Sequence, residues 1–222
     1  MTDVNDFQKF QRVCLDVLSQ SNNCAESQQL FGEAESIPEM VGAWQKFWAG
    51  MIHEVPEQVI KVFTEFYPVY REKIRLGGLY YDEAPVLTPS SPMVSYMVLV
   101  GDGDEPLEII GRHRVYIIGG RPVICRGNCK VYVCADRAQV DIYDNCRCNA
   151  EAGRVTAYGR SYLNGKGVLA CHDSSTVYIV GGSLSDYGHL RIDAYNDAKV
   201  DSFTSRCITL HNQAELTIRS NE

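Results

Sequence analysis

The sequence predicts an α+β protein in which an N-terminal helical cap is followed by a β-solenoid of about fourteen octapeptide repeats. Apolar residues recur at a helical spacing up to about residue 76, a segment rich in Pro and Gly follows, and an eight-residue frame begins at Gly111. We therefore divide the 222 residues into a helical domain (1–80), a connector with capping strands (81–110) and a solenoid (111–222).

The first predicted helix runs from about residue 4 to residue 20. Its buried face is formed by apolar residues at a helical spacing, namely Phe7, Phe10, Cys14, Val17 and Leu18. The sequence SIPE at 36–39 has the form of a capping box and predicts the start of a second helix. That helix is expected to bury Met40, Trp44, Phe47, Trp48 and Met51.

Two prolines mark the expected starts of the next helices, because proline suits the first turn of a helix. Pro56 is expected to begin a third helix, which buries Val59, Ile60, Phe63 and Phe66. Pro68 is expected to begin a short fourth helix that ends at Gly77. Residues 77–93 are interpreted as a connector, and the strand-like segments 94–100 and 107–111 are expected to pair and to cover the first coil.

From Gly111 onward, each octad has the order turn, turn, small, x, apolar, x, apolar, x. Alternation places the third, fifth and seventh positions on the inner side of a strand, while Gly, Asn, Asp or Ser at the first two positions forms a turn. The fifth position is occupied by residues such as Val115, Val123, Val131, Val140, Val177 and Val200, with irregular units around Leu169 and Ser185. Such strands need stacked neighbours, which predicts a solenoid with either two or three octads per coil.

Composition limits the setting and the partners. The formal net charge of −7 is concentrated in residues 1–110, which hold 7 Lys and Arg against 17 Asp and Glu, whereas residues 111–222 hold 14 against 11. This small positive excess is weak support for nucleic-acid binding, so we do not expect a nucleic-acid partner. No leader-like or membrane-spanning apolar run is recognisable, so we expect a cytoplasmic protein without a membrane partner.

The nine cysteines are expected to be reduced thiols, several of which fill the solenoid core as small apolar residues. Five of them, which could instead bind zinc, are Cys125, Cys129, Cys134, Cys146 and Cys148. Against a zinc site, the inner positions are already used by the core, and Cys134 at position eight is expected to point away from Cys125 and Cys129. We therefore predict no metal site and no cofactor.

A catalytic site is also not predicted. Cys171, His172 and Asp173 have the residue types of a thiol relay, but neighbouring residues in a strand point to opposite sides. The repeats also lack the six-residue period of hexapeptide acyltransferases and the glycine-rich nonads of calcium-binding β-rolls. We therefore expect a protein that is not an enzyme.

Tyrosines and arginines on the outer side of the solenoid are the candidate partner-binding residues, because both types are favoured at protein interfaces. They are Tyr116, Tyr132 and Tyr178 at position six, Tyr143, Tyr158 and Tyr195 at position eight, and the interleaved Arg147, Arg154 and Arg191. The alternative is that the tyrosines stack only because adjacent coils place them about 4.8 Å apart.

The octads ADRAQVDIYDN, YNDAKVDSF and DSSTVYIVGG resemble those of octapeptide-repeat β-solenoid proteins of gut Bacteroidetes and their phages, whose repeats run as Asp-Ser-Ala-Thr-Val-x-Ala-Tyr. The resemblance covers residues 111–219 and, more loosely, the helical segment. It implies a solenoid fold and a phage or mobile-element setting, and it implies no activity.

The expected function is a non-enzymatic binding module that engages a protein partner through a solenoid face or through the acidic helical domain. A phage-encoded inhibitor of a host protein is one form of this expectation. The first alternative is a self-assembling structural component of a phage particle or cell surface. The second is a thiol-dependent enzyme or a zinc-binding protein, and self-association as a homo-oligomer is left open.

Overall fold

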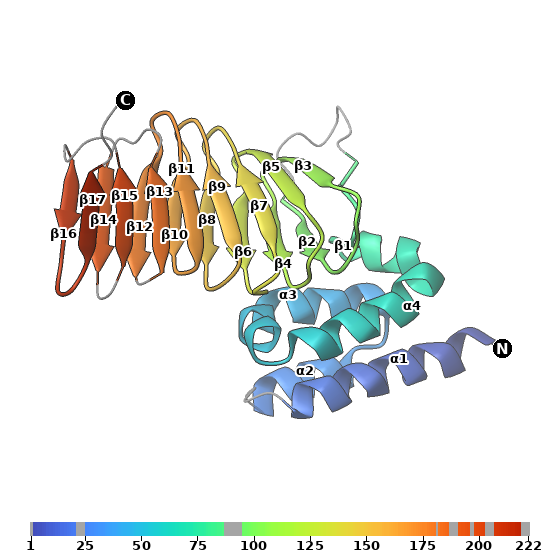
Figure 1. Ribbon diagram of the computed structural model, residues 1–222. Helices are drawn as coiled ribbons and strands as arrows, with labels where there is room; N and C mark the ends of the chain where they lie inside the picture. The colour runs from blue at the N-terminus through green and yellow to red at the C-terminus, as the bar shows by residue number, and fades with distance from the viewer. Residues whose placement is uncertain are drawn as a thin grey trace.

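The computed structural model describes residues 2–20, 25–86, 95–180, 182–186, 191–195, 198–202 and 207–218, and it describes their side chains except those of 2–6, 25, 47–53 and 180. Within this part of the chain, four helices are followed by seventeen strands (Figure 1). The strands are parallel and form two sheets that wind as a β-solenoid. The predicted class, a helical region followed by a solenoid, is confirmed.

Helix α1 (Thr2–Ser19) agrees with the first predicted helix. Phe10, Cys14, Val17 and Leu18 are buried in the helical core, and Phe7 is partly buried against it. The next helix, α2 (Ala25–Glu33), was not predicted because its nine residues contribute a single buried aromatic side chain, Phe31, and show no apolar stripe. The Gln11 amide of α1 donates to the Phe31 carbonyl (2.8 Å), which satisfies a backbone acceptor near the end of α2.

Helix α3 (Ile37–Glu54) begins where the capping-box sequence predicts. The Ser36 hydroxyl accepts a hydrogen bond from the Glu39 N–H (3.4 Å), and the Glu39 carboxylate accepts one from the N–H of Glu35 (2.9 Å). Met40 and Trp44 are buried as expected. The predicted core residues Phe47, Trp48 and Met51 have side chains outside the described set.

The predicted third and fourth helices are joined in one element, α4 (Pro56–Leu76), which is kinked two residues after the predicted boundary at Pro68. Pro68 lies inside it, and Tyr70 departs from helical geometry (φ −115°, ψ 19°). A proline inside a helix removes one backbone hydrogen bond and bends the axis, yet apolar side chains on both sides of Pro68 remain buried in the same core. Val59, Phe63 and Phe66 are buried as predicted, and Ile60 is partly buried.

Each coil of the solenoid contributes one strand to each of two sheets, so two octads form one coil. Sheet A holds β1 (Leu79–Tyr81), β2 (Met97–Val100), β4 (Arg114–Ile117), β6 (Lys130–Val133), β8 (Arg147–Ala150), β10 (Tyr162–Gly165), β12 (Thr176–Val180), β14 (Arg191–Tyr195) and β16 (Ile208–Leu210). Sheet B holds β3 (Leu107–Gly111), β5 (Val123–Gly127), β7 (Gln139–Ile142), β9 (Arg154–Ala157), β11 (Val168–Cys171), β13 (Ser183–Asp186), β15 (Lys199–Ser202) and β17 (Glu215–Ile218).

The inner positions of the two sheets form one apolar core. Val131, Cys148 and Leu163 follow one another in register on adjacent strands of sheet A, and Val140 and Val155 do so on sheet B. All five side chains are at most 3% exposed. Small inner residues such as Ala150 and Cys125 are also fully buried, because the space between two sheets joined by short turns is narrow.

The expected pairing of segments 94–100 and 107–111 is wrong. β2 pairs with β1 and β4 in sheet A, whereas β3 pairs with β5 in sheet B. The turn-forming sequence between them leads from one sheet to the other instead of closing a hairpin. Sheet A therefore begins at Leu79, within the segment 77–93 that we interpreted as a connector, and sheet B begins at Leu107.

The irregular unit around Ser185 is a shift of one residue in the frame. Leu184, not Ser185, lies beside Leu169 and Val200 and is buried, so Asp186 falls at an inner position next to Cys171. Asp186 is 2% exposed. Its carboxylate accepts hydrogen bonds from the Cys171 thiol (3.4 Å) and from the Ser202 hydroxyl, and these bonds make its burial tolerable.

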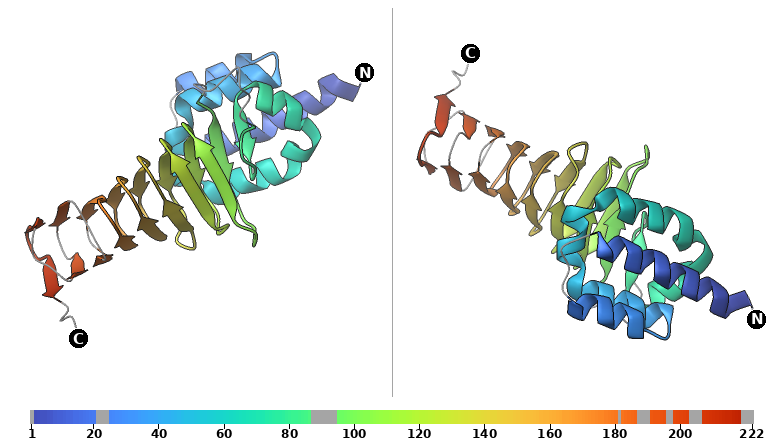
Figure 2. Two further views of the ribbon diagram at one scale, coloured as in Figure 1. Left: turned by 90° about the horizontal axis from the view of Figure 1, so that it is seen from above. Right: turned by 90° about the horizontal axis from the view of Figure 1, so that it is seen from below.

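The helical domain lies against the outer face of sheet A, beside the N-terminal coils (Figure 1; Figure 2). Its core includes outward-facing side chains of the first strands, among them Leu79, Met97, Leu99 and Tyr116. We expected the helices to cap the stack, but their core is built on the side of the sheet. The later coils extend away from the helices, as both views in Figure 2 show.

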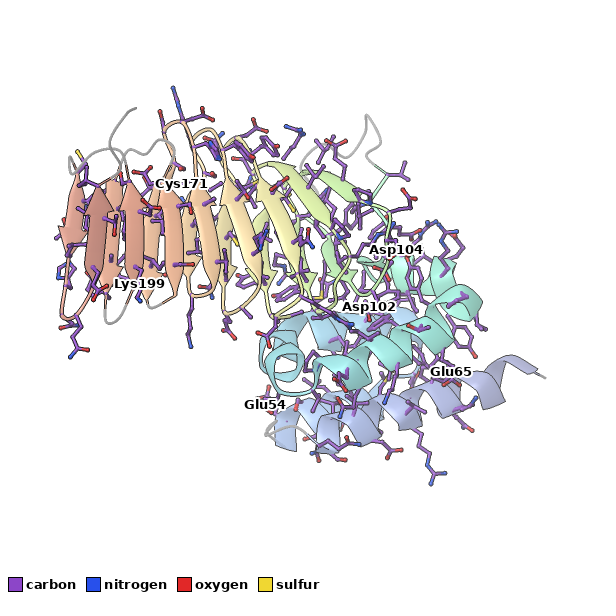
Figure 3. All side chains as sticks on the ribbon, in the orientation of Figure 1. Glu54, Glu65, Asp102, Asp104, Cys171 and Lys199 are labelled. Carbon is purple, nitrogen blue, oxygen red and sulfur yellow. The ribbon has the colours of Figure 1, made fainter. Side chains whose placement is uncertain are left out.

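Hydrogen bonds and ion pairs connect helix α4 to Glu83, next to the contact between the helical domain and sheet A. Glu83, which follows β1, accepts hydrogen bonds from Tyr67, Arg71 and Arg75 of α4. Partial burial alone would raise the pKa of Glu83, but these hydrogen bonds lower the pKa to about 2. A further ion pair lies within the solenoid, where Asp102, labelled in Figure 3 between β2 and β3, pairs with Arg137 between β6 and β7 (2.7 Å).

Candidate binding surfaces of the solenoid

The nine predicted partner-binding residues do not form one face. In a two-sheet coil, position eight of sheet B and position four of sheet A lie on either side of the same turn. Tyr143, Tyr158 and Arg147 therefore share one edge of the solenoid, formed by turns such as 143–146, which lead from sheet B to sheet A. We call this the B-to-A edge, and the edge formed by the turns from sheet A to sheet B the A-to-B edge.

A row of stacked side chains follows the B-to-A edge, and we call it the aromatic ladder. It consists of Arg126, Tyr143, Tyr158 and His172. The Arg126 guanidinium lies 4.0 Å from the centre of the Tyr143 ring. The Tyr143 and Tyr158 ring centres are 4.6 Å apart, and those of Tyr158 and His172 are 4.7 Å apart.

Parallel register explains the ladder. Cys125, Ile142, Ala157 and Cys171 follow one another in register, so the residues after them also stack. The ring planes of Tyr143 and Tyr158 are within 7° of parallel, and those of Tyr158 and His172 are within 12°. All four ladder residues are partly exposed, so the row presents its edge to solvent. Arg126 is also held by Glu108 (2.8 Å).

Tyr116 and Tyr132 do not belong to a free surface, which corrects the prediction for these two residues. Their rings stack 4.7 Å apart on the outer face of sheet A, but that part of the face is covered by the helices. Tyr116 is 5% exposed, and Tyr132 is partly buried against the helical core. Both tyrosines join the two parts of the chain.

The remaining predicted residues lie elsewhere on the solenoid. Tyr178 and Tyr195 contact each other on sheet A, with ring centres 4.7 Å apart, and Tyr195 stacks on His211 at 4.1 Å beside the A-to-B edge. Arg191 of β14 pairs with Asp193 of the same strand (2.7 Å). Arg154 is exposed on sheet B. Arg126 and His172, which complete the ladder, are not among the nine predicted residues.

The residues of the possible thiol relay diverge, as the alternation of a strand predicts. Cys171 points into the core and contacts Asp186, whereas His172 stacks on Tyr158 at the edge. The Asp173 carboxylate accepts a hydrogen bond from the Gly159 N–H (3.0 Å). Asp173 therefore stabilises a turn.

The cysteines of the predicted core are buried. Cys125, Cys129, Cys146 and Cys148 lie in the solenoid core, whereas Cys134 points away from them, as predicted, and packs against the helical core. Burial raises the pKa of Cys134 to about 12, and burial also raises the pKa of Cys148. Within the described residues, no three His, Cys, Asp or Glu side chains are grouped so that they could hold a metal ion.

We expect these thiols to be unreactive until the protein unfolds, because thiol reagents attack the thiolate. Among the described cysteines, Cys207 alone is exposed. In Cys24→Ser protein, which removes a cysteine outside the described residues, a chromogenic disulfide reagent at pH 8 should titrate one thiol rapidly and the others only in denaturant. Adding Cys207→Ser should abolish the rapid phase, and a second rapid thiol would contradict the core assignment.

The geometry defines the class of the protein as a two-sheet β-solenoid with a helical domain on the outer face of one sheet. Searches with the chain find no matching protein-family model, no matching curated protein and no matching solved structure. None of the described helices combines the length and the apolar character needed to cross a membrane.

Proposed function

We propose that this chain is a non-enzymatic binding module that holds a protein partner on the B-to-A edge of the solenoid. The observation that supports the proposal is the aromatic ladder, in which Arg126, Tyr143, Tyr158 and His172 form one partly exposed row. Tyrosine and arginine are enriched among the residues that dominate binding energy at protein interfaces.

The ladder suits binding because its side chains are already ordered. Binding is weakened by roughly 0.5–1.5 kcal/mol for each flexible side chain that becomes immobilised at the interface. In the ladder, each ring is held between neighbours on adjacent coils, and Arg126 is held by both Glu108 and Tyr143. A partner that packs against the aromatic ladder therefore causes only a small further loss of side-chain conformational entropy.

The resemblance to repeat proteins of Bacteroidetes phages suggests the setting for this proposal. A rigid, non-catalytic protein from a phage is suited to block a host protein by occupying its surface. We therefore propose a host protein as the partner, and the first screen uses lysate of a Bacteroidetes host. Self-assembly into a structural component is the outcome that would replace this proposal.

The test compares two pairs of tyrosines that contact each other equally closely. Tyr143→Ser/Tyr158→Ser removes the ladder pair, whereas Tyr178→Ser/Tyr195→Ser removes a pair elsewhere on the solenoid. A tagged full-length chain captures candidates from lysate, and each captured protein is then purified and titrated against wild type and both variants.

We expect the ladder variant to bind the purified partner at least about tenfold more weakly than the control variant, since truncating a central aromatic contact costs about 2 kcal/mol or more. Melting curves of both variants check that each remains folded. Equal affinities of the two variants, or self-association as the sole interaction, would reject the ladder as the binding site.

A further inference from the structure

A groove lined by basic side chains lies on the sheet A side of the B-to-A edge. It consists of two adjoining hollows of about 460 and 610 Å³, which share Asn145 and Arg147 as lining residues. Its four cationic residues are Arg112, Lys130, Arg147 and Arg160, and we call the surface the basic groove. No carboxylate is among the residues that line either hollow.

The cations of the basic groove are placed side by side without neutralisation. Lys130 is in register with Arg147 on the next strand and with Arg114 on the preceding one. Like charges directly opposite each other in a sheet are destabilising. None of the four groove cations forms an ion pair with a carboxylate of the described residues, whereas Arg121, Arg126, Arg137 and Arg191 elsewhere on the solenoid each have one.

Two carboxylates of the B-to-A turns are engaged with the backbone. Asp144 accepts a hydrogen bond from the Gly127 N–H (2.9 Å), and Asp173 accepts one from the Gly159 N–H (3.0 Å). A row of adjacent cations whose charge is not neutralised by carboxylates of the same chain is an electrostatically unfavourable arrangement. Unfavourable arrangements of this kind are expected at functional sites, where a bound ligand supplies the opposite charge.

The backbone under the groove is fixed before any ligand binds. The Lys130 N–H donates to the His113 carbonyl (2.8 Å), and the Arg147 N–H donates to the Cys129 carbonyl (2.9 Å). Lys130 and Arg147 therefore project from strands that are hydrogen-bonded on both sides, whereas Arg112 and Arg160 lie in the turns before β4 and β10. Asn128, Asn145 and Tyr162 add neutral hydrogen-bonding groups between the charges.

We propose that the basic groove binds an extended acidic segment of the partner protein, with carboxylates of that segment paired to Lys130, Arg147 and Arg160. This inference rests on the proposed function and specifies the chemistry of the partner. From the turn before β4 to Thr176 of β12 the groove crosses four coil steps, or about 19 Å at 4.8 Å per coil, which matches about six residues of extended peptide.

A short acidic peptide fits this surface better than a nucleic acid does. The four groove cations account for the whole positive excess of residues 111–222, which hold 14 Lys and Arg against 11 Asp and Glu. A long polyanion would extend past the groove onto solenoid surface with no positive excess, and the acidic residues 1–110, with 17 Asp and Glu against 7 Lys and Arg, would repel it. A six-residue segment can pair with the groove cations and end there.

The experiment uses fluorescein-labelled hexaglutamate and the full-length chain, with fluorescence anisotropy as the readout. The groove variant is Lys130→Gln/Arg147→Gln, and the matched control is Lys199→Gln/Arg154→Gln. The control removes the same residue types from exposed positions of sheet B, where Figure 3 labels Lys199, so both variants have the same net charge.

We expect wild type to bind hexaglutamate with an affinity that falls as salt is added, since the contacts are ionic. The groove variant should bind at least about tenfold more weakly, and the control should stay within about twofold of wild type. The groove variant should also melt at the same or a higher temperature, because removing two adjacent cations relieves their repulsion.

Three outcomes would overturn the proposal. They are no binding by wild type at millimolar probe, equal losses in the two variants, or tighter groove-dependent binding of a six-nucleotide DNA strand than of hexaglutamate. Failure of this inference is distinguishable from failure of the proposed function. A partner protein that still depends on Tyr143 and Tyr158, with no hexaglutamate binding, rejects the groove and leaves the ladder in place.

Discussion

Val140→Asp should abolish the cooperative folding of the solenoid. Val140 is 3% exposed and lies in register between Val123 and Val155, so an aspartate there would place a carboxylate in the apolar core. An unpaired buried charge costs about 5 kcal/mol or more, which is comparable with the whole stability of a typical domain, about 5–15 kcal/mol.

The control for this experiment is the neighbouring residue. Gln139 is exposed in the same strand, so Gln139→Asp introduces the same side chain on the outer side and should change the free energy of unfolding by about 0.5 kcal/mol or less. Urea unfolding followed by circular dichroism measures both. A Val140→Asp protein that unfolds at the same urea concentration as Gln139→Asp would contradict the assignment of inner and outer positions.

Gly165→Ala should be the second strongly destabilising change, although it adds one methyl group. Gly165 is at inner position seven of β10, with φ +155°, and a Cβ atom there would lie 1.9 Å from the Ala150 carbonyl oxygen on the adjacent coil. Because that neighbour is backbone, no side-chain rotation relieves the overlap. We expect a loss of about 3 kcal/mol or more in the free energy of unfolding.

The matched control is Gly42→Ala in helix α3. A Cβ atom at Gly42 would have no neighbour within 4 Å, and alanine favours the helix over glycine by about 1 kcal/mol. Thermal melting should therefore show the two Gly-to-Ala changes shifting Tm in opposite directions, at about 2–4 °C for each kcal/mol. A Gly165→Ala protein with the Tm of wild type would mean that adjacent coils are less closely spaced at this point.

The eight-residue frame predicted the solenoid because its alternation is a local property of each strand. Val140 and Val200 have apolar side chains at inner positions whether a coil contains two octads or three. Which outer residues meet depends on the number of octads per coil. With two per coil, Tyr143 stacks on Tyr158, while Tyr195 belongs to the other sheet. The division of the nine candidate residues among several surfaces therefore could not be read from the frame alone.

The basic groove was not predicted from the sequence, again because the number of octads per coil decides which outer residues are neighbours. Lys130 and Arg147 are separated by one octad of sheet B, and they become neighbours once alternate octads are assigned to alternate sheets. A list of outer residues in chain order mixes the two sheets and hides the row of like charges. The overall charge of residues 111–222 also gave no indication of it, because 11 Asp and Glu offset most of the 14 Lys and Arg in this part of the chain.

The position of the helical domain did leave a signal in the sequence. Residues 115–118 read VYII and residues 97–100 read MVLV, so both sides of these strands are apolar. A strand that is apolar on both sides is covered on both sides. Tyr116 and Ile118 accordingly belong to the helical core, whereas Val115 and Ile117 belong to the solenoid core.

The spacing between paired residues on adjacent coils also determines which duplications and deletions the coding sequence can tolerate. The partner of Tyr162 is Thr176, fourteen residues on, and the partner of Met97 is Arg114, seventeen residues on, so adjacent coils tolerate turns of unequal length. Because a coil contacts mainly the coils beside it, an in-frame duplication or loss of fourteen to seventeen codons replaces one stacking contact by a similar one. Recombination between repeats can thus lengthen or shorten a surface one coil at a time while the protein still folds.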